Sequence, residues 1–97
     1  MAKYILLWEL DTTRTPDDPK VRQQQWRTLQ DMVVKQLETG ELKDWGLYIG
    51  GNKGYAIIEG TDMDVLKLTT TYIPYVSFDV KQVASVEQVI ENTKAMG

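Results

Sequence analysis

A chain of 97 residues, 42% hydrophobic and 26% charged, is enough for one soluble domain, 1–97, with a single core. Its formal net charge of −3 argues against a nucleic-acid-binding protein, because such proteins usually carry a basic excess on one face. It contains no cysteine and no histidine, which excludes disulfides, cysteine-ligated metals and histidine-based acid–base or haem chemistry. We therefore expect no metal and no cofactor.

The first apolar segment, YILLWEL at 4–10, is too short for the core of a signal peptide followed by a cleavage site. No run of about 18 apolar residues follows anywhere in the sequence. We therefore expect a cytoplasmic protein that does not enter a membrane.

The same segment, 4–10, is rich in β-branched and aromatic residues, which predicts the first strand. It is apolar on both faces: Leu6, Trp8 and Leu10 lie on one, and Ile5 and Leu7 lie on the other. Because a solvated face normally shows polar residues at alternate positions, we expect both faces of this strand to be covered.

A long amphipathic helix is predicted from 20 to 39, because its apolar residues recur at spacings of three and four. Turn formers precede it, and either Thr15-Pro16 or Asp18-Pro19 supplies an N-cap followed by proline in the first turn. Gly40 is expected to end the helix in the left-handed conformation.

A hairpin is predicted from 42 to 60. Trp45, Leu47 and Ile49 alternate with polar or small residues, and the strand pattern resumes at 55–59 after the glycine-rich turn 50–54. Glycine and asparagine tolerate the positive φ angles that tight hairpin turns require.

The last third of the chain predicts a helix, a strand and a second, terminal helix. Thr61 is a plausible N-cap for a helix that ends before Pro74, and the alternation at 78–83 predicts the fourth strand. Ser85 and Gln88 then form a capping-box sequence at the start of a short C-terminal helix.

This order of elements predicts an α+β fold: a ferredoxin-like βαββαβ antiparallel sheet with two helices on one face, plus the short C-terminal helix. The other face of the sheet would then be bare and apolar, which is unusual for a soluble monomer. We expect a second copy of the chain to cover it, giving a homodimer packed sheet to sheet. The alternative is a monomer whose terminal helix folds over the free face.

Three segments carry a resemblance: KYILLWEL at 3–10, IGGNKGYAIIEG at 49–60 and IPYVSFDVKQVASVEQVIE at 73–91. Together they resemble a family of small uncharacterised prokaryotic proteins within the dimeric α+β barrel superfamily. The resemblance implies pairing as a dimeric α+β barrel. It implies no single activity, since that superfamily includes muconolactone isomerases, antibiotic-biosynthesis monooxygenases, haem-degrading enzymes and ligand-sensing domains of transcription regulators. The haem-degrading branch that ligates iron through histidine is disfavoured, because the chain has no histidine.

The candidate catalytic groups are carboxylates and tyrosines on the strands. Glu9 and Glu59 could lie beside Tyr48 and Tyr55 in a cleft between the sheet and the helices, where desolvation would raise a carboxyl pKa and suit it to proton transfer. The other interpretation is that both carboxylates lie at strand ends in contact with water. The candidate ligand-binding residues are all aromatic: Trp8, Trp45, Tyr48 and Tyr55.

Other polar groups have simpler structural interpretations. The turn 50–54 could form a backbone nest for an anion beside Lys53, but a hairpin connection explains it. The acidic cluster Asp11, Asp17 and Asp18 could hold a divalent cation, but helix capping explains it. Asp79 and Lys81 share one face of the last strand and are expected to pair.

Three functional hypotheses follow. The first is a homodimer of unknown function that binds a small apolar or aromatic molecule between the sheet and the helices. The second is a cofactor-independent isomerase or monooxygenase acting on an aromatic-derived substrate, with Glu9 or Glu59 as base and Tyr48 or Tyr55 as proton donor. The third is a protein interaction module. A deep pocket that contains one of these carboxylates would distinguish the second from the others.

Overall fold

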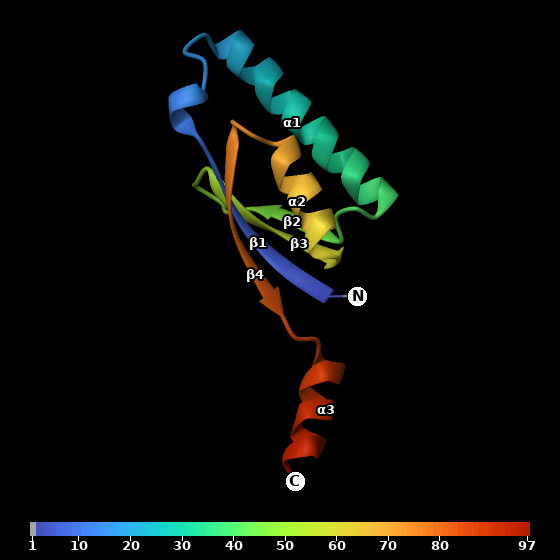
Figure 1. Cartoon of the computed structure of the whole chain (residues 1–97). Helices are drawn as coiled ribbons and strands as arrows, with labels where there is room; N and C mark the ends of the chain where they lie inside the picture. The colour runs from blue at the N-terminus through green and yellow to red at the C-terminus, as the bar shows by residue number, and fades with distance from the viewer. Residues whose placement is uncertain (1) are drawn as a thin grey trace.

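The computed structural model describes residues 2–97 (Figure 1). Within this range the chain forms an α+β fold with a four-stranded sheet and three α-helices. In chain order the elements are β1 (Ala2–Leu10), the 3-10 turn η1 (Thr12–Arg14), α1 (Pro19–Thr39), β2 (Asp44–Leu47), β3 (Lys53–Gly60), α2 (Asp62–Thr71), β4 (Val76–Val83) and α3 (Val86–Met96).

The four strands form one open antiparallel sheet in the order β2-β3-β1-β4. β1 lies in the middle, where Leu6 is opposite Ala56 of β3 and Val80 of β4. This arrangement confirms the expected α+β class with an antiparallel sheet, and it is compatible with the ferredoxin-like expectation. No helix in residues 2–97 is both long enough and apolar enough to cross a bilayer.

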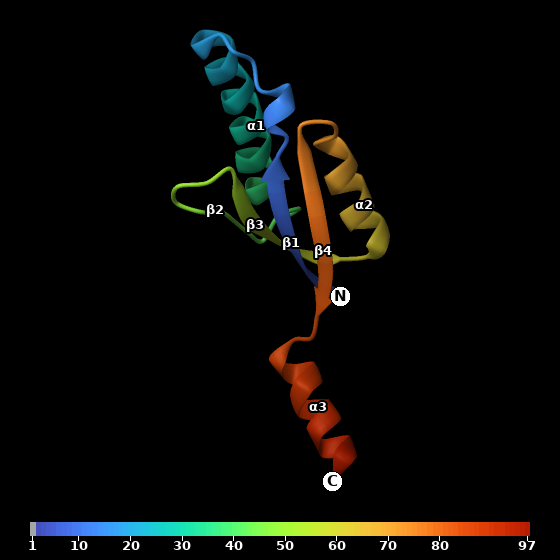
Figure 2. The same ribbon diagram turned by 90° about the vertical axis from the view of Figure 1, so that its left-hand side faces the viewer.

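Helices α1 and α2 lie on the same side of the sheet, to its right in Figure 1, and Figure 2 looks onto the opposite face. The core lies between these two layers. Side chains of a strand alternate between its two faces. The buried apolar side chains of β1 and β3 are therefore those directed at the helices: Tyr4, Leu6, Trp8, Ala56 and Ile58.

Side-chain caps begin each helix as the sequence predicts. Of the two alternatives for α1, Asp18 is the N-cap and accepts a hydrogen bond from the Lys20 amide at 2.9 Å, with Pro19 following it. Gly40 ends α1 with φ of 83°. Capping boxes begin α2, at Thr61, and α3, at Ser85.

The hairpin is shorter than predicted. β2 ends at Leu47, and Ile49 lies in the turn with its side chain fully exposed, so its expected place in the strand is wrong. The chain reverses earlier because the Tyr48 amide donates to the Lys53 carbonyl at 2.8 Å and the Gly51 amide donates to the Tyr48 carbonyl at 3.2 Å. Gly50 adopts the positive φ, 90°, that this turn requires.

The face of the sheet away from α1 and α2 has an apolar centre, which we call the open face. Its central residues, Ile5, Leu7, Tyr55 and Ile57, lie in register across β1 and β3 and are half-buried in the single chain. α3 does not cover them, because it extends away from the sheet beyond the end of β4 (Figures 1 and 2). Within residues 2–97, the open face therefore has no helical cover.

Candidate functional site

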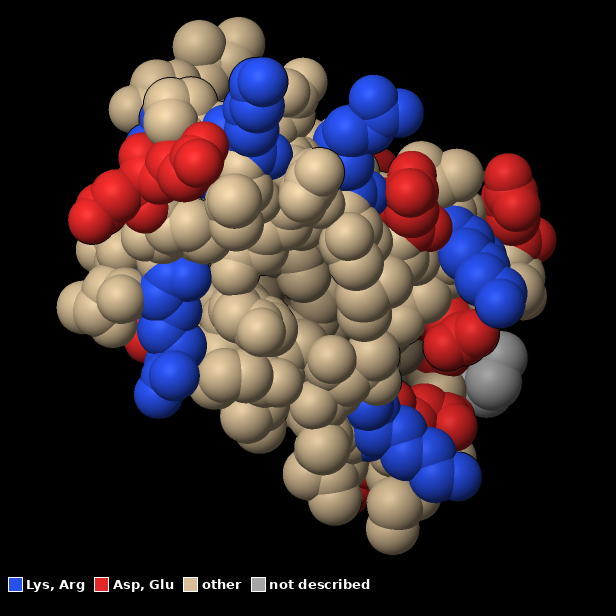
Figure 3. Space-filling view, turned by 90° about the horizontal axis from the view of Figure 1, so that it is seen from above, with Lys and Arg blue, Asp and Glu red and all other residues tan. Residues whose placement is uncertain are grey.

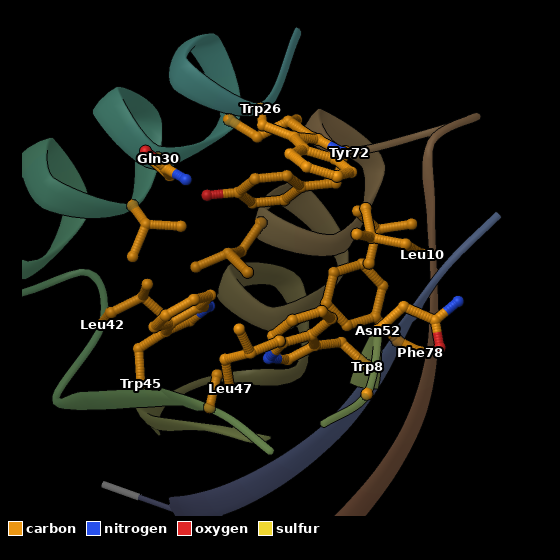
Figure 4. Close-up of a pocket in the computed structure, with 16 residues that line it drawn as sticks. Trp8, Leu10, Trp26, Gln30, Leu42, Trp45, Leu47, Asn52, Tyr72 and Phe78 are labelled. Atoms are coloured by element: carbon orange, nitrogen blue, oxygen red, sulfur yellow. The ribbon is translucent and has the colours of Figure 1, made fainter. Parts of the chain in front are cut away.

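A cavity of about 260 Å³ lies between the sheet and the helices (Figure 4). It is walled by residues of β1, the β2–β3 hairpin, β4, α1 and α2. Five of the residues that line it are aromatic: Trp8, Trp26, Trp45, Tyr72 and Phe78. A concave lining of aromatic and aliphatic side chains is typical of a small-molecule site.

A stacked pair of indoles forms the floor of the cavity. The rings of Trp8 on β1 and Trp45 on β2 have centroids 5.3 Å apart and planes inclined by 12°. Trp8 is 7% exposed, and its indole N–H donates to the Tyr55 carbonyl at 3.2 Å. The pair therefore offers a rigid, flat apolar surface to the cavity.

Two further aromatic residues, Tyr72 after α2 and Phe78 on β4, form the adjoining wall. Their rings meet edge to face with centroids 6.1 Å apart. The Tyr72 hydroxyl donates to the buried side-chain oxygen of Gln36 at 2.5 Å, which ties this wall to α1. Burial, with a smaller effect of Glu41, raises the pKa of Tyr72 to about 12, so its hydroxyl stays protonated at neutral pH.

The opening of the cavity lies between α1 and the hairpin. Its exposed lining residues are Trp26 and Gln30 on α1 and Leu47 and Gly51 on the hairpin. Seen from the end of the molecule opposite α3, the surface is hollowed among uncharged side chains, and charged side chains lie farther out (Figure 3). Outside the hollow, the Arg22 guanidinium lies 5.7 Å from the centre of the Trp26 ring.

The polar groups of the cavity are few and uncharged. Gln30 and Asn52 contribute side-chain amides, and Tyr72 contributes its hydroxyl. No lysine, arginine, aspartate or glutamate is among the residues described as lining it. A charged ligand would lose its hydration without gaining a counter-charge, so the cavity suits a neutral molecule.

The structure places the two predicted ligand-binding tryptophans, Trp8 and Trp45, in this cavity, but it places the glutamates elsewhere. Because Leu6 and Trp8 face the helices, strand alternation directs Glu9 to the open face, where it lies 3.9 Å from Lys53. Glu59 is opposite Lys3, at the other end of the same pair of strands. Of the two interpretations of Glu9 and Glu59, the structure agrees with the one that places both carboxylates at strand ends in contact with water: both are exposed and about 20 Å apart along the strands.

The predicted tyrosines also lie outside the cavity. The Tyr55 hydroxyl donates to Asp44 at 2.8 Å, and this hydrogen bond raises the Tyr55 pKa above its ordinary value. Tyr48 and Glu9 border a second hollow of about 300 Å³, which also includes Leu7 and Trp8. The aromatic cavity therefore contains no predicted base or proton donor, and one predicted pair, Glu9 and Tyr48, lies in the second hollow instead.

The sequence did not single out Trp26, Gln30, Asn52, Tyr72 and Phe78 as site residues. Trp26 and Tyr72 belong to helical apolar stripes, which are typical of ordinary core positions. Tyr72 is itself a core residue, 6% exposed, whereas Trp26 differs from the core by its partial exposure of 41%. The exposed fraction of Trp26 depends on how closely α1 approaches the hairpin. The spacing of residues in the sequence does not give that distance.

The other polar clusters have structural roles. Asp11 caps the η1 turn by accepting from the Thr13 hydroxyl at 2.6 Å and its amide at 3.0 Å, and these bonds lower the pKa of Asp11. Lys81 lies 3.7 Å from Asp79, the expected pairing. In the part of the chain that the structure describes, no three acidic, histidine or cysteine side chains are grouped to hold a metal.

Comparison with known proteins assigns no relative to the chain: no protein-family model matches it, and no curated protein is significantly similar. The resemblance to the dimeric α+β barrel proteins therefore depends on the three segments at 3–10, 49–60 and 73–91.

Proposed function

We propose that the protein is a homodimer of ferredoxin-like subunits, paired as a dimeric α+β barrel, and that each subunit binds a small neutral aromatic or apolar molecule in its cavity. One observation carries the proposal of binding. The cavity has no charged lining residue and presents the stacked indoles of Trp8 and Trp45, together with Trp26, to one concave space. An aromatic ligand bound there would pack its ring against the indoles and lose its contact with water, which favours binding.

The support for the homodimer is the open face. Ile5, Leu7 and Ile57 form an apolar centre on a sheet whose helices all lie elsewhere. Exposed apolar patches of several hundred Å² usually mark interaction surfaces. A second copy offers the same patch, and a two-fold axis makes the patch self-complementary.

The proposed binding is tested by titrating the full chain with 1-naphthol by calorimetry, and with 1-naphthoate as its charged analogue. We expect measurable binding of 1-naphthol and binding of the carboxylate at least about tenfold weaker, because the cavity offers it no counter-charge. Ala56→Leu, which adds bulk to a buried residue of the lining, should weaken 1-naphthol binding.

Ala95→Leu on exposed α3 makes the same change away from the cavity and should leave affinity unchanged. Absence of 1-naphthol binding by the wild-type chain, or equal affinity of Ala56→Leu, would contradict the proposed site.

A further inference from the structure

α3 is an amphipathic helix without a partner in the single chain. Its apolar residues fall on one side, which we call the α3 stripe: Val86, Val89, Ile90 and Met96, each between 49% and 80% exposed. An isolated helix of 11 residues is marginal in water and normally gains its stability by packing an apolar side. The stripe therefore requires a surface that its own subunit does not provide.

A second apolar surface without a partner surrounds the opening of the cavity. Trp26 is 41% exposed, Leu47 is 51% exposed, and Ile49 in the adjacent turn is fully exposed. Figure 3 shows this end of the molecule as a hollow among uncharged side chains. Water entering through it would reach the indoles on which the proposed binding depends.

These two surfaces lie at opposite ends of the subunit. The cavity opens where Leu10 is opposite Val76, whereas α3 follows the end of β4 where Val83 is opposite Lys3 (Figure 1). The eight residues of β4 separate the two ends by about 26 Å. The connection between β4 and α3 has two residues, Ala84 and Ser85, so α3 cannot reach the opening of its own subunit.

A second copy removes this separation. When two open faces pack about a two-fold axis perpendicular to the strands, the α3 end of each subunit lies beside the cavity end of the other. Packed sheets are about 10 Å apart, and the hairpin edge of the opening lies three strand spacings, about 14 Å, across the sheet from β4. α3 is 11 residues and about 16 Å long, and together with the two-residue connection before it α3 can span that distance.

The area of the interface also favours a second copy of the chain as the partner of α3. A sheet of three strands with eight or nine residues and one with four offers roughly 450 Å² per subunit. A stable dimer usually buries about 800 Å² per partner. If α3 of each subunit also packs on its partner, the dimer buries additional area that the open faces alone do not supply.

We infer that α3 of each subunit closes the cavity opening of its partner and adds the α3 stripe to the wall of the ligand site. This inference rests on the proposed homodimer and cavity. A complete site then exists only in the dimer, and ligand binding and dimer stability support each other.

Cross-linking tests the position of α3, because the natural chain has no cysteine and two can be introduced without background. In the full-length double variant Leu47→Cys/Ile90→Cys, we expect oxidation to give a disulfide-linked dimer on a non-reducing gel. Leu47→Cys/Ala95→Cys is the matched control, because Ala95 lies on the opposite side of α3, and it should link at least about tenfold more slowly. Equal rates in the two variants, or a link within one chain, would overturn the inference.

Binding provides the second test and separates this inference from the proposed function. Val89→Gln/Ile90→Gln keeps good helix formers on α3 but removes the centre of the stripe, so 1-naphthol should bind about tenfold more weakly. Glu91→Gln/Ala95→Gln, on the polar side, should bind like the wild type. If the wild type binds and the stripe variant binds equally well, α3 does not close the site although the site exists. If the wild type fails to bind, the proposed ligand site fails, and the cross-link still reports where α3 lies.

Discussion

The indole rings of Trp8 and Trp45 stack at 5.3 Å although β3 lies between their strands. They can meet because the residues of β3 beneath them are small: Gly54 is opposite Trp8, and Ala56 is opposite Trp45. A larger side chain at either position would separate the rings and fill the cavity. The floor of the proposed site therefore depends as much on Gly54 and Ala56 as on the tryptophans.

The first prediction concerns this close approach. A Cβ at Gly54 would lie 2.0 Å from the Gly46 carbonyl oxygen and 2.4 Å from the Trp8 ring. We expect Gly54→Ala to reduce the free energy of unfolding by about 1–3 kcal/mol or more, as overpacking of a core does. Urea denaturation measures this. Gly51→Ala, where a Cβ would be 3.9 Å from its nearest neighbour, should change stability by less than about 1 kcal/mol; equal losses would contradict the explanation.

The second prediction concerns the aromatic floor. Trp45→Leu keeps an apolar side chain but removes the face that stacks on Trp8, so 1-naphthol affinity should fall about three- to tenfold. Near-ultraviolet circular dichroism should lose the signal of the coupled indoles. Tyr48→Leu removes an exposed aromatic ring outside the cavity and serves as the control. A similar loss of affinity in both variants would argue against a role for the stack.

The third prediction concerns the open face. Leu7→Lys places a charge among Ile5, Tyr55 and Ile57, where a packed dimer would have to desolvate it. We expect the dimer dissociation constant to rise by at least about a hundredfold, measured by analytical ultracentrifugation. Gln82→Lys, exposed on the other face of β4, should remain dimeric. A wild-type chain that sediments as a monomer at micromolar concentration would contradict the proposed dimer directly.

The fourth prediction concerns the buried pair Tyr72 and Gln36. Tyr72→Phe leaves the Gln36 side-chain oxygen without its donor, so the free energy of unfolding should fall by about 1–3 kcal/mol in urea titrations. Tyr72→Phe/Gln36→Leu removes both polar partners and should recover part of that loss. No recovery in the double variant would show that the bond is not the cause.

The same pair predicts a pH dependence. The folded-state pKa of Tyr72 is about 12, above its ordinary value of 10.0, so folding favours the protonated hydroxyl. Its contribution to stability is complete below pH 10 and is lost as pH rises from 10 to 12. The stability difference between wild type and Tyr72→Phe should therefore shrink over that range, and a constant difference would contradict the raised pKa.

Local signals in the sequence determined the secondary structure well. The Asp18-Pro19 and Thr61 caps, the αL residue Gly40 and the capping box at Ser85 and Gln88 all begin or end helices as expected. These interactions join residues two to four positions apart, so they can be predicted from the neighbouring residues in the sequence. The hairpin end was predicted less well, because the hydrogen bonds of the turn, and not the apolar pattern, ended β2 before Ile49.

The tertiary structure alone decided where the site lies. Alternation shows that Trp8 and Glu9 face opposite ways, but only the position of α1 and α2 tells which of them enters the cavity. The sequence likewise predicts two apolar faces for β1 and a terminal amphipathic helix, but not that α3 leaves the sheet and lies far from the cavity opening. Cavities and uncovered faces arise from the packing of distant segments, and the spacing of residues along the chain carries no record of those distances.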